Sequence, residues 1–195
     1  MAVIEDGAGR GFTARVNSEN RLYTFADSVP SGAVAASRGK MWGISTGDLT
    51  FTNDSTSAIA YLRYSGLEKL VVSRVGYTTG ASDGTGNTTY RIIKNPTTGT
   101  IVDNAIAANT TNRNFSGTSS SLSGVQYSGA DGYTLTNGVV VGDLNRESAG
   151  LFILEANESP YILENGNSFG VTVTPPTGNT SQTNRLFIVA YELVV

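Results

Sequence analysis

Apolar and polar residues alternate with a period of two along most of this chain, and turn residues interrupt the alternation at short intervals. This period places every second side chain on one face of a β-strand, whereas the spacing typical of helices is nearly absent. Asn137-Gly138 and Asn165-Gly166 are the strongest turn signals, since both residue types tolerate positive φ. The predicted strands after residue 40 are "MWGIST", "SAIAYLRY", "EKLVVSRVGY", "TTYRIIK", "GTIVD", "NGVVVGD", "GLFILEA", "SFGVTVT" and "RLFIVAYELVV".

Strands at this spacing, separated by Gly, Pro and Asn loops, predict an all-β sandwich or barrel. Only two segments could be helical, Gly32 to Ser37 and Asp103 to Ala108. We allow at most a single turn in each, because helix propensity alone does not stabilise such short segments. The last strand runs to Val195, and we expect neighbouring strands to hold it. Pro175-Pro176 lacks backbone N–H groups and predicts the crossing between the sheets.

The N-terminal region is predicted to form an arm. "GFTARV" and "RLYTFA" alternate like strands around the loop "NSEN", and the small, polar stretch from Asp27 to Lys40 is typical of a connection. We therefore expect an arm and connection over residues 1–40 and a β-sandwich over residues 41–195.

The composition excludes several kinds of chemistry. The chain has no Cys and no His, so it holds neither a thiolate nucleophile nor a Ser-His-Asp triad. Its net charge of −3 and the lack of a basic cluster predict no nucleic-acid partner. The start of the chain has no signal-peptide pattern, and the longest apolar stretch, Leu186 to Ala190, is too short to cross a bilayer. We expect a soluble protein with no membrane partner.

Two glycine-rich stretches resemble ligand loops only superficially. "DGAGRG", Asp6 to Gly11, has no strand before it and no helix after it, which a dinucleotide site requires. "SDGTGNTT" places Asp83 and Asn87 at a spacing seen in calcium loops, but the later carboxylate is missing. Asp, Asn and Gly are also ordinary turn residues. The sequence therefore predicts no cofactor and no metal.

Paired carboxylates are the one catalytic device that the composition allows. Glu155 with Glu158, or Asp143 with Glu147, would suit a glycosidase, but solvated carboxylates at loop edges are the simpler interpretation. An alternative function is sugar binding by aromatic rings that stack on pyranoses, although most of these rings lie in predicted strands that favour Tyr and Trp. The candidate rings are Trp42, Tyr61, Tyr64, Tyr77, Tyr90 and Tyr127. We predict no catalytic residues and no enzymatic activity.

Three stretches carry a resemblance to a known group. "YRIIKNPTTGTIVDNA", "NRNFSGTSSSLSG" and "SFGVTVTPPTGNTS" resemble β-rich virion proteins encoded among the head genes of tailed bacteriophages, and "GRGFTARVNSENRLYTFADS" is similar to the strand-like arm that precedes their sandwich. The resemblance implies a jelly-roll-like antiparallel β-sandwich that serves as a capsid decoration, cement or fibre-type component. It also implies synthesis in the host cytoplasm and a final location on the capsid surface of the virion.

Three functions follow in order of preference. The first is a non-enzymatic decoration or cement protein that binds the major capsid protein and stabilises the head. The second is a receptor- or carbohydrate-binding module of the fibre or tail, and the third is a β-sandwich glycosidase. We expect a homotrimer, because the apolar runs in "GLFILEA" and "RLFIVAYELVV" seek partners and closed rotational assembly covers such surfaces.

Overall fold

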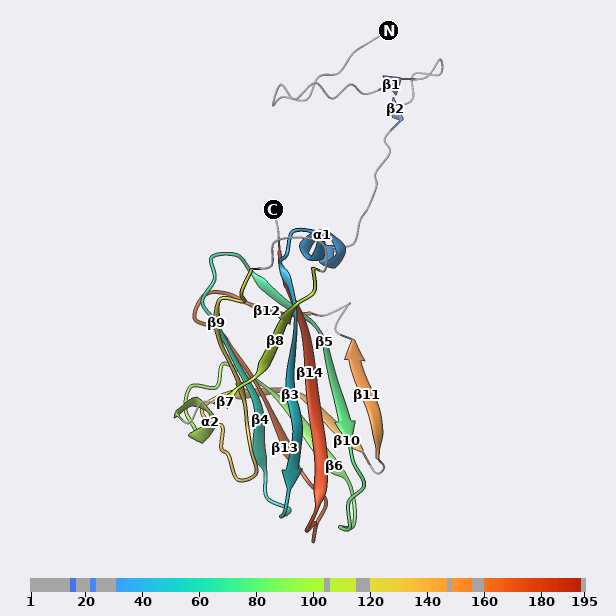
Figure 1. Ribbon diagram of the computed structural model, residues 1–195, viewed down its shortest axis with the longest axis vertical. Helices are drawn as coiled ribbons and strands as arrows, with labels where there is room; N and C mark the ends of the chain where they lie inside the picture. Colours follow the sequence, from blue (N-terminus) through green and yellow to red (C-terminus); the bar gives the residue numbers. More distant parts are fainter. Residues whose placement is uncertain are drawn as a thin grey trace. The chain divides into compact units, whose positions relative to one another are not determined.

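Figure 1 shows the computed structural model of the chain, which describes residues 15–16, 22–23, 31–103, 106–114, 120–146, 149–155 and 160–193. The chain divides into two units, Met1–Pro30 and Ser31–Val195. The first unit contains an antiparallel pair of strands, β1 (Arg15–Val16) and β2 (Leu22–Tyr23). The predicted N-terminal hairpin is confirmed in these four residues, and the rest of its predicted strands lies outside the described residues.

The second unit is a sandwich of two sheets whose strand pairs are all antiparallel. The first sheet has the order β10 (Val139–Arg146), β6 (Thr88–Lys94), β13 (Ser168–Thr174), β4 (Ser57–Tyr64), β9 (Gly124–Ser128) and β7 (Ile106–Ala107). The second sheet has the order β11 (Gly150–Glu155), β5 (Leu70–Thr79), β14 (Gln182–Glu192), β3 (Met41–Phe51) and β8 (Asn109–Asn112), and β12 (Tyr161–Leu163) also pairs with β5. The predicted all-β sandwich is confirmed, while the jelly-roll connectivity stays a prediction.

Two short helices accompany the sheets. α1 (Ser31–Ser37) is longer than the single turn that the sequence allowed, and it packs against β3 and β14 within the unit Ser31–Val195. α2 (Thr100–Asp103) replaces the strand predicted over Gly99 to Asp103. The single helical turn that the sequence allowed over Asp103 to Ala108 does not form in Ile106 and Ala107, which make up β7 and pair with β9.

The local geometry around α2 explains the first of these errors. Gly99 has a φ of 131°, which turns the chain out of an extended path. The backbone N–H of Thr100 then donates to the hydroxyl of Thr134 at 3.1 Å, which satisfies one of the free N–H groups at the start of the helix. Ile101 is fully buried next to Ala58 and Tyr61. Tertiary packing therefore overrides the strand propensity of this segment.

The main core lies between the two sheets and is built from large aromatic and aliphatic side chains of both. Trp42 on β3 is buried, and its indole N–H donates to the carbonyl oxygen of Ser120 at 2.8 Å. Tyr77 of the second sheet and Tyr90 of the first sheet lie with ring centroids 4.3 Å apart. Burial raises the pKa of Tyr77 far above its usual range and that of Tyr90 to about 12.

A buried polar cluster links the sheets within this core, and we call it the interior polar cluster. The hydroxyl of Tyr90 lies 2.5 Å from that of Thr79 and donates to the side-chain oxygen of Asn184 at 2.7 Å. The amide of Gln182 donates to the hydroxyl of Thr88 at 2.9 Å. All five side chains are buried, so their hydrogen bonds specify how the sheets align, because misalignment would leave polar atoms unsatisfied.

A second polar link joins the sheets through Glu192, near the end of β14. Tyr64 on β4 donates its hydroxyl to one carboxylate oxygen at 2.8 Å, and the ammonium of Lys40 lies 2.8 Å from the other. Burial, together with the hydrogen bond to Glu192, raises the pKa of Tyr64. β14 pairs with β3 on one side and β5 on the other, so the last described strand is held by neighbours as predicted. Val194 and Val195 lie outside the described residues.

The outer face of the first sheet has its own smaller core. Ala58, Tyr61 and Ile101 are buried there, and partly buried residues such as Tyr127, Tyr133 and Leu135 pack against them. Leu135 occupies the space that a side chain at Gly170 would fill, which explains why β13 needs glycine at this position. The loops around α2 and before β10 therefore cover this face, so its apolar residues are not free to bind a partner.

Candidate functional site

Exposed apolar residues gather along one side of the sandwich. Within the described residues, eight large hydrophobic side chains are exposed, and only Leu67 and Ile106 lie away from β10, β11 and β12. β10 ends the first sheet, and β11 and β12 lie at the edge of the second sheet, next to β5 (Figure 1). We call the remaining six residues, which are 42% to 66% exposed, the apolar edge: Val139, Val140, Val141, Leu151, Ile153 and Ile162.

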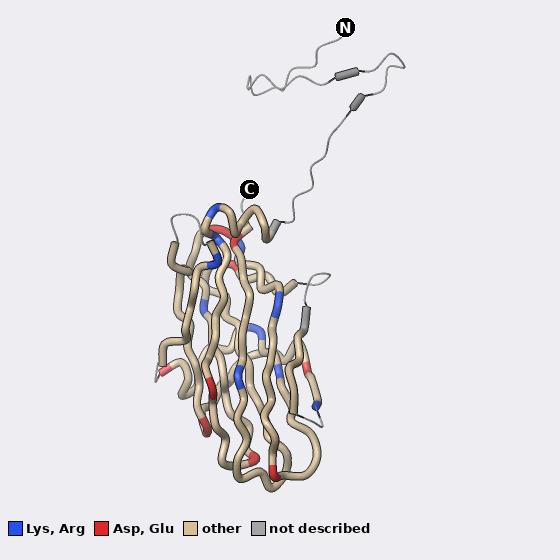
Figure 2. The backbone as a smooth tube through the Cα atoms, turned by 45° about the vertical axis from the view of Figure 1, so that its right-hand side comes forward, with Lys and Arg blue, Asp and Glu red and all other residues tan. Residues whose placement is uncertain are grey.

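The two strand edges lie beside each other. The guanidinium of Arg146 on β10 stacks over the ring of Phe152 on β11, 4.3 Å from its centroid. Val141 on β10 and Ile162 on β12 line the same pocket. Figure 2 shows that charged residues are sparse along the strands of the sandwich, although β10 itself carries Asp143 and Arg146. Exposed large apolar side chains gathered at two neighbouring strand edges suit a protein–protein contact.

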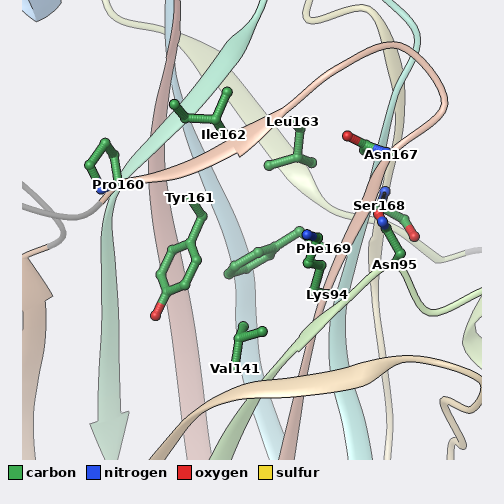
Figure 3. A pocket seen from close by; sticks show the side chains of 10 residues that line it. All are labelled: Lys94, Asn95, Val141, Pro160, Tyr161, Ile162, Leu163, Asn167, Ser168 and Phe169. Carbon is green, nitrogen blue, oxygen red and sulfur yellow. Dashed lines mark hydrogen bonds between the residues drawn. The ribbon is translucent and has the colours of Figure 1, made fainter.

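A pocket of about 210 Å³ opens at the apolar edge (Figure 3). Tyr161 and Phe169 form one wall, with ring centroids 5.6 Å apart, and burial raises the pKa of Tyr161. Lys94 lies directly opposite Phe169 in the strand register, so its side chain projects from the same face of the sheet. Its ammonium makes no ion pair within the described residues.

Most polar groups that line the pocket already form hydrogen bonds with neighbouring residues of the same chain. The hydroxyl of Ser168 donates to the carbonyl of Pro96 at 2.6 Å, and its N–H donates to the side-chain oxygen of Asn95 at 3.0 Å. The side-chain oxygen of Asn167 accepts the N–H of Glu164 at 3.0 Å. Small-molecule sites usually enclose ~300 Å³ or more. This pocket is therefore smaller than a typical small-molecule site.

The loop that resembled a calcium site has a structural role. The carboxylate of Asp83 accepts hydrogen bonds from the hydroxyl and the N–H of Thr180 and from the N–H of Ser181. These bonds lower the pKa of Asp83 to about 2. They fasten the loop between β5 and β6 to the loop between β13 and β14, which is the predicted crossing between the sheets. In the described part of the chain, no three His, Cys, Asp or Glu side chains cluster as a metal site would need.

Asp131 and Asp54 fasten other loops at the same ends of the strands. Although burial opposes it, hydrogen bonds from the N–H and hydroxyl of Thr52, and from Asn53 and Ser57, lower the pKa of Asp131. Asp54 accepts the N–H of Gly178 at 2.9 Å. The roles of Asp131 and Asp54 were not predicted from the sequence, because their hydrogen-bond partners lie far away along the chain.

The proposed carboxylate pairs are only partly described. Asp143 on β10 forms an ion pair with Arg91 on β6 at 3.3 Å, directly across the strand register. Glu147, Glu158 and the side chain of Glu155 lie outside the described residues, as does the stretch from Asp6 to Gly11.

The candidate sugar-stacking rings are core residues. Among the six rings, only Tyr127 is partly exposed, and it stacks on Tyr61 with centroids 6.1 Å apart. A buried ring cannot stack on a ligand from solvent, so these side chains do not form a binding platform. The five buried rings are Trp42, Tyr61, Tyr64, Tyr77 and Tyr90.

Comparisons with known proteins add no family to this picture. None of the helices in the described part is both long and apolar enough to cross a membrane. No protein-family model, curated protein or solved structure matches the chain.

Proposed function

We propose that this protein is a non-enzymatic structural component of a tailed-bacteriophage virion, which binds the major capsid protein on the outer surface of the head and stabilises it. The resemblance of its sequence to β-rich head proteins supports this proposal. The observation that carries it is the apolar edge, because an exposed apolar surface along two strand edges suits a protein partner better than a small ligand.

We assign the capsid contact to the β10 part of the apolar edge. Val139, Val140 and Val141 are three consecutive exposed valines next to the pocket that Lys94 borders. An apolar side chain of the capsid protein fills this pocket, and an acidic neighbour on the same segment meets the ammonium of Lys94. The apolar contact contributes the affinity, and the charge fixes the orientation.

Mass spectrometry and electron microscopy of purified virus particles test the proposal. A copy number comparable to that of the major capsid protein, with density on the head surface, is the expected result. A much lower copy number, with density at the tail or fibres, would favour a receptor-binding module instead. Absence from the particle would overturn the proposal.

A matched pair of variants tests the contact itself. Val140→Asp places a charge in the apolar edge and should weaken binding to capsids that lack the protein by at least about tenfold, or ~1.4 kcal/mol. Thr111→Asp adds the same charge at an exposed position of β8, an edge strand that carries none of the apolar edge residues, and should leave capsid binding unchanged. Equal binding by both variants would exclude β10 as the contact.

A further inference from the structure

The edges of the two sheets differ in how well they resist pairing with another strand. Native edge strands usually carry a Lys, a Pro or a bulge, or they are very short. β10 has a register shift between Val140 and Gly142, and β7 is only two residues long. β8 has the sequence Asn-Thr-Thr-Asn and no apolar side chain. These three edges, and β12 with only three residues, are therefore poor partners for another strand.

β11 has none of these protections. It pairs with β5 without a register shift from Gly150 to Glu155, and it contains no Lys, Pro or Arg. Its single charged residue is the last one, Glu155. The exposed side chains of Leu151 and Ile153 lie opposite Thr78 and Gly76, on the outer face of the second sheet. β11 is thus a regular edge strand with two exposed apolar side chains.

We propose that β11 pairs in antiparallel fashion with β11 of a second copy of this chain, about a two-fold axis at Phe152. In this register Leu151 of each copy lies opposite Ile153 of the other, and both residues stay on the outer face. Two apolar cross-strand pairs form, each of a kind that stabilises antiparallel sheets. The two second sheets become one continuous sheet.

The local sequence is suited to such self-pairing. In the segment Leu151-Phe152-Ile153, one large apolar residue lies on each side of the axis. Both copies therefore contribute the same residues to the contact, as a two-fold interface requires. Phe152 lies opposite Tyr77 and faces the interior, where Arg146 of the same chain covers its ring. No charged residue of β11 lies at the axis, while the guanidinium of Arg146 from β10 stacks on Phe152 of its own copy beside it.

The proposed contact is small, so we expect a weak dimer that must be measured over a range of protein concentrations. Five paired residues cover on the order of 500 Å² per copy, less than the ~800 Å² of a standard interface. We therefore expect a dimer whose population rises with concentration across the micromolar range. The homotrimer expected from the sequence is the competing outcome. Part of its basis is lost, because the run from Arg185 onward lies in β14 between two neighbouring strands.

Sedimentation velocity of the full chain from about 1 to 200 µM, a range chosen for weak interfaces, tests the stoichiometry. A mass that rises from one chain towards two supports the proposal, and a monomer throughout or a trimer overturns it. Leu151→Lys combined with Ile153→Lys should abolish the dimer. Leu67→Lys is the control, since Leu67 is 98% exposed but lies in a loop, and it should leave the dimer intact.

Disulfide cross-linking tests the register, since the chain has no Cys of its own. Residues directly opposite in an antiparallel pair have Cα atoms about 4.5–5.5 Å apart, within the range that a disulfide spans. A mixture of the Leu151→Cys and Ile153→Cys proteins should cross-link into a mixed dimer under mild oxidation, and neither protein should do so alone. Self-cross-linking without the mixed species would overturn the axis at Phe152.

This proposal does not depend on where the protein acts. The dimer is measured on the purified chain, and the virion location is measured on particles. A monomer found on the head would leave the proposed function standing and remove the two-fold contact. A dimer absent from particles would do the reverse.

Discussion

The hydroxyl of Tyr90 lies between Thr79 and Asn184, in the buried space between the two sheets. Removing it leaves the side-chain oxygen of Asn184 without this donor, and an unsatisfied buried polar group costs about 1–3 kcal/mol. Tyr90→Phe should therefore lower the free energy of unfolding by this amount, measured by urea denaturation. Tyr127→Phe is the matched control, because the hydroxyl of Tyr127 makes no hydrogen bond within the described part of the chain. An equal loss in both variants would contradict the role of the interior polar cluster.

The hydrogen bonds of Asp83 make the stability of the folded protein depend on pH in the acid range. Its pKa falls from 3.8 to about 2 in the folded protein, so its contribution is fully present above pH 4 and is lost as the pH falls through 2. Asp83→Asn should therefore make the unfolding midpoint less dependent on pH between 4 and 2. Thermal unfolding followed by circular dichroism at a series of pH values measures this. Asp103→Asn, at an exposed position at the end of α2, should retain the steeper wild-type dependence.

At the scale of elements, the sequence was informative where alternation continued over several residues. β4, β5, β6, β13 and β14 were all predicted, because their apolar residues recur with the period of a strand. β8 and β9 were missed: β8 has no apolar residue, and β9 has one valine and one tyrosine. These strands form because β3 and β4 offer open edges to pair with, which a local pattern cannot reveal.

The candidate site was predictable only in part. The runs at Val139–Val141 and Leu151–Leu154 were predicted as strands, and the second was expected to seek a partner. The run in β14 was expected to do the same, but it lies in the middle of its sheet. A continuous apolar run has the same sequence in a central strand and in an edge strand, and only long-range pairing separates them. The pocket beside Lys94 depends on strands far apart in the sequence.

The segment around α2 is held by one buried side chain. Ile101 is fully buried in the smaller core on the outer face of the first sheet. Ile101→Ala should lower the free energy of unfolding by about 2–5 kcal/mol, the usual range for such a truncation in a core. Urea denaturation gives the value. Val102→Ala, at the partly buried neighbouring position, should cost clearly less, and a reversed order would show that α2 does not anchor this face.

At the scale of the whole molecule, the two units predict where the chain can be shortened. Deleting residues 1–30 removes the first unit and should leave a folded sandwich, with a melting temperature within about 4 °C of the full chain, a shift of ~1 kcal/mol. Deleting residues 1–40 also removes α1 and Lys40, which pairs with Glu192. This second variant should melt clearly lower, and circular dichroism compares the two. Failure of the shorter deletion to fold would make the first unit part of the sandwich.

The central position of β14 has a consequence for synthesis on the ribosome. β3 and β5 are made early but do not pair with each other, and β14 joins them only after more than half of the chain has followed. Until then both strands expose free edges, and the interior polar cluster lacks Gln182 and Asn184. The second sheet therefore cannot close co-translationally in the order in which its strands emerge. Nascent chains interrupted before residue 182 should depend on chaperones and be degraded quickly, because pairing across such a sequence separation comes late in folding.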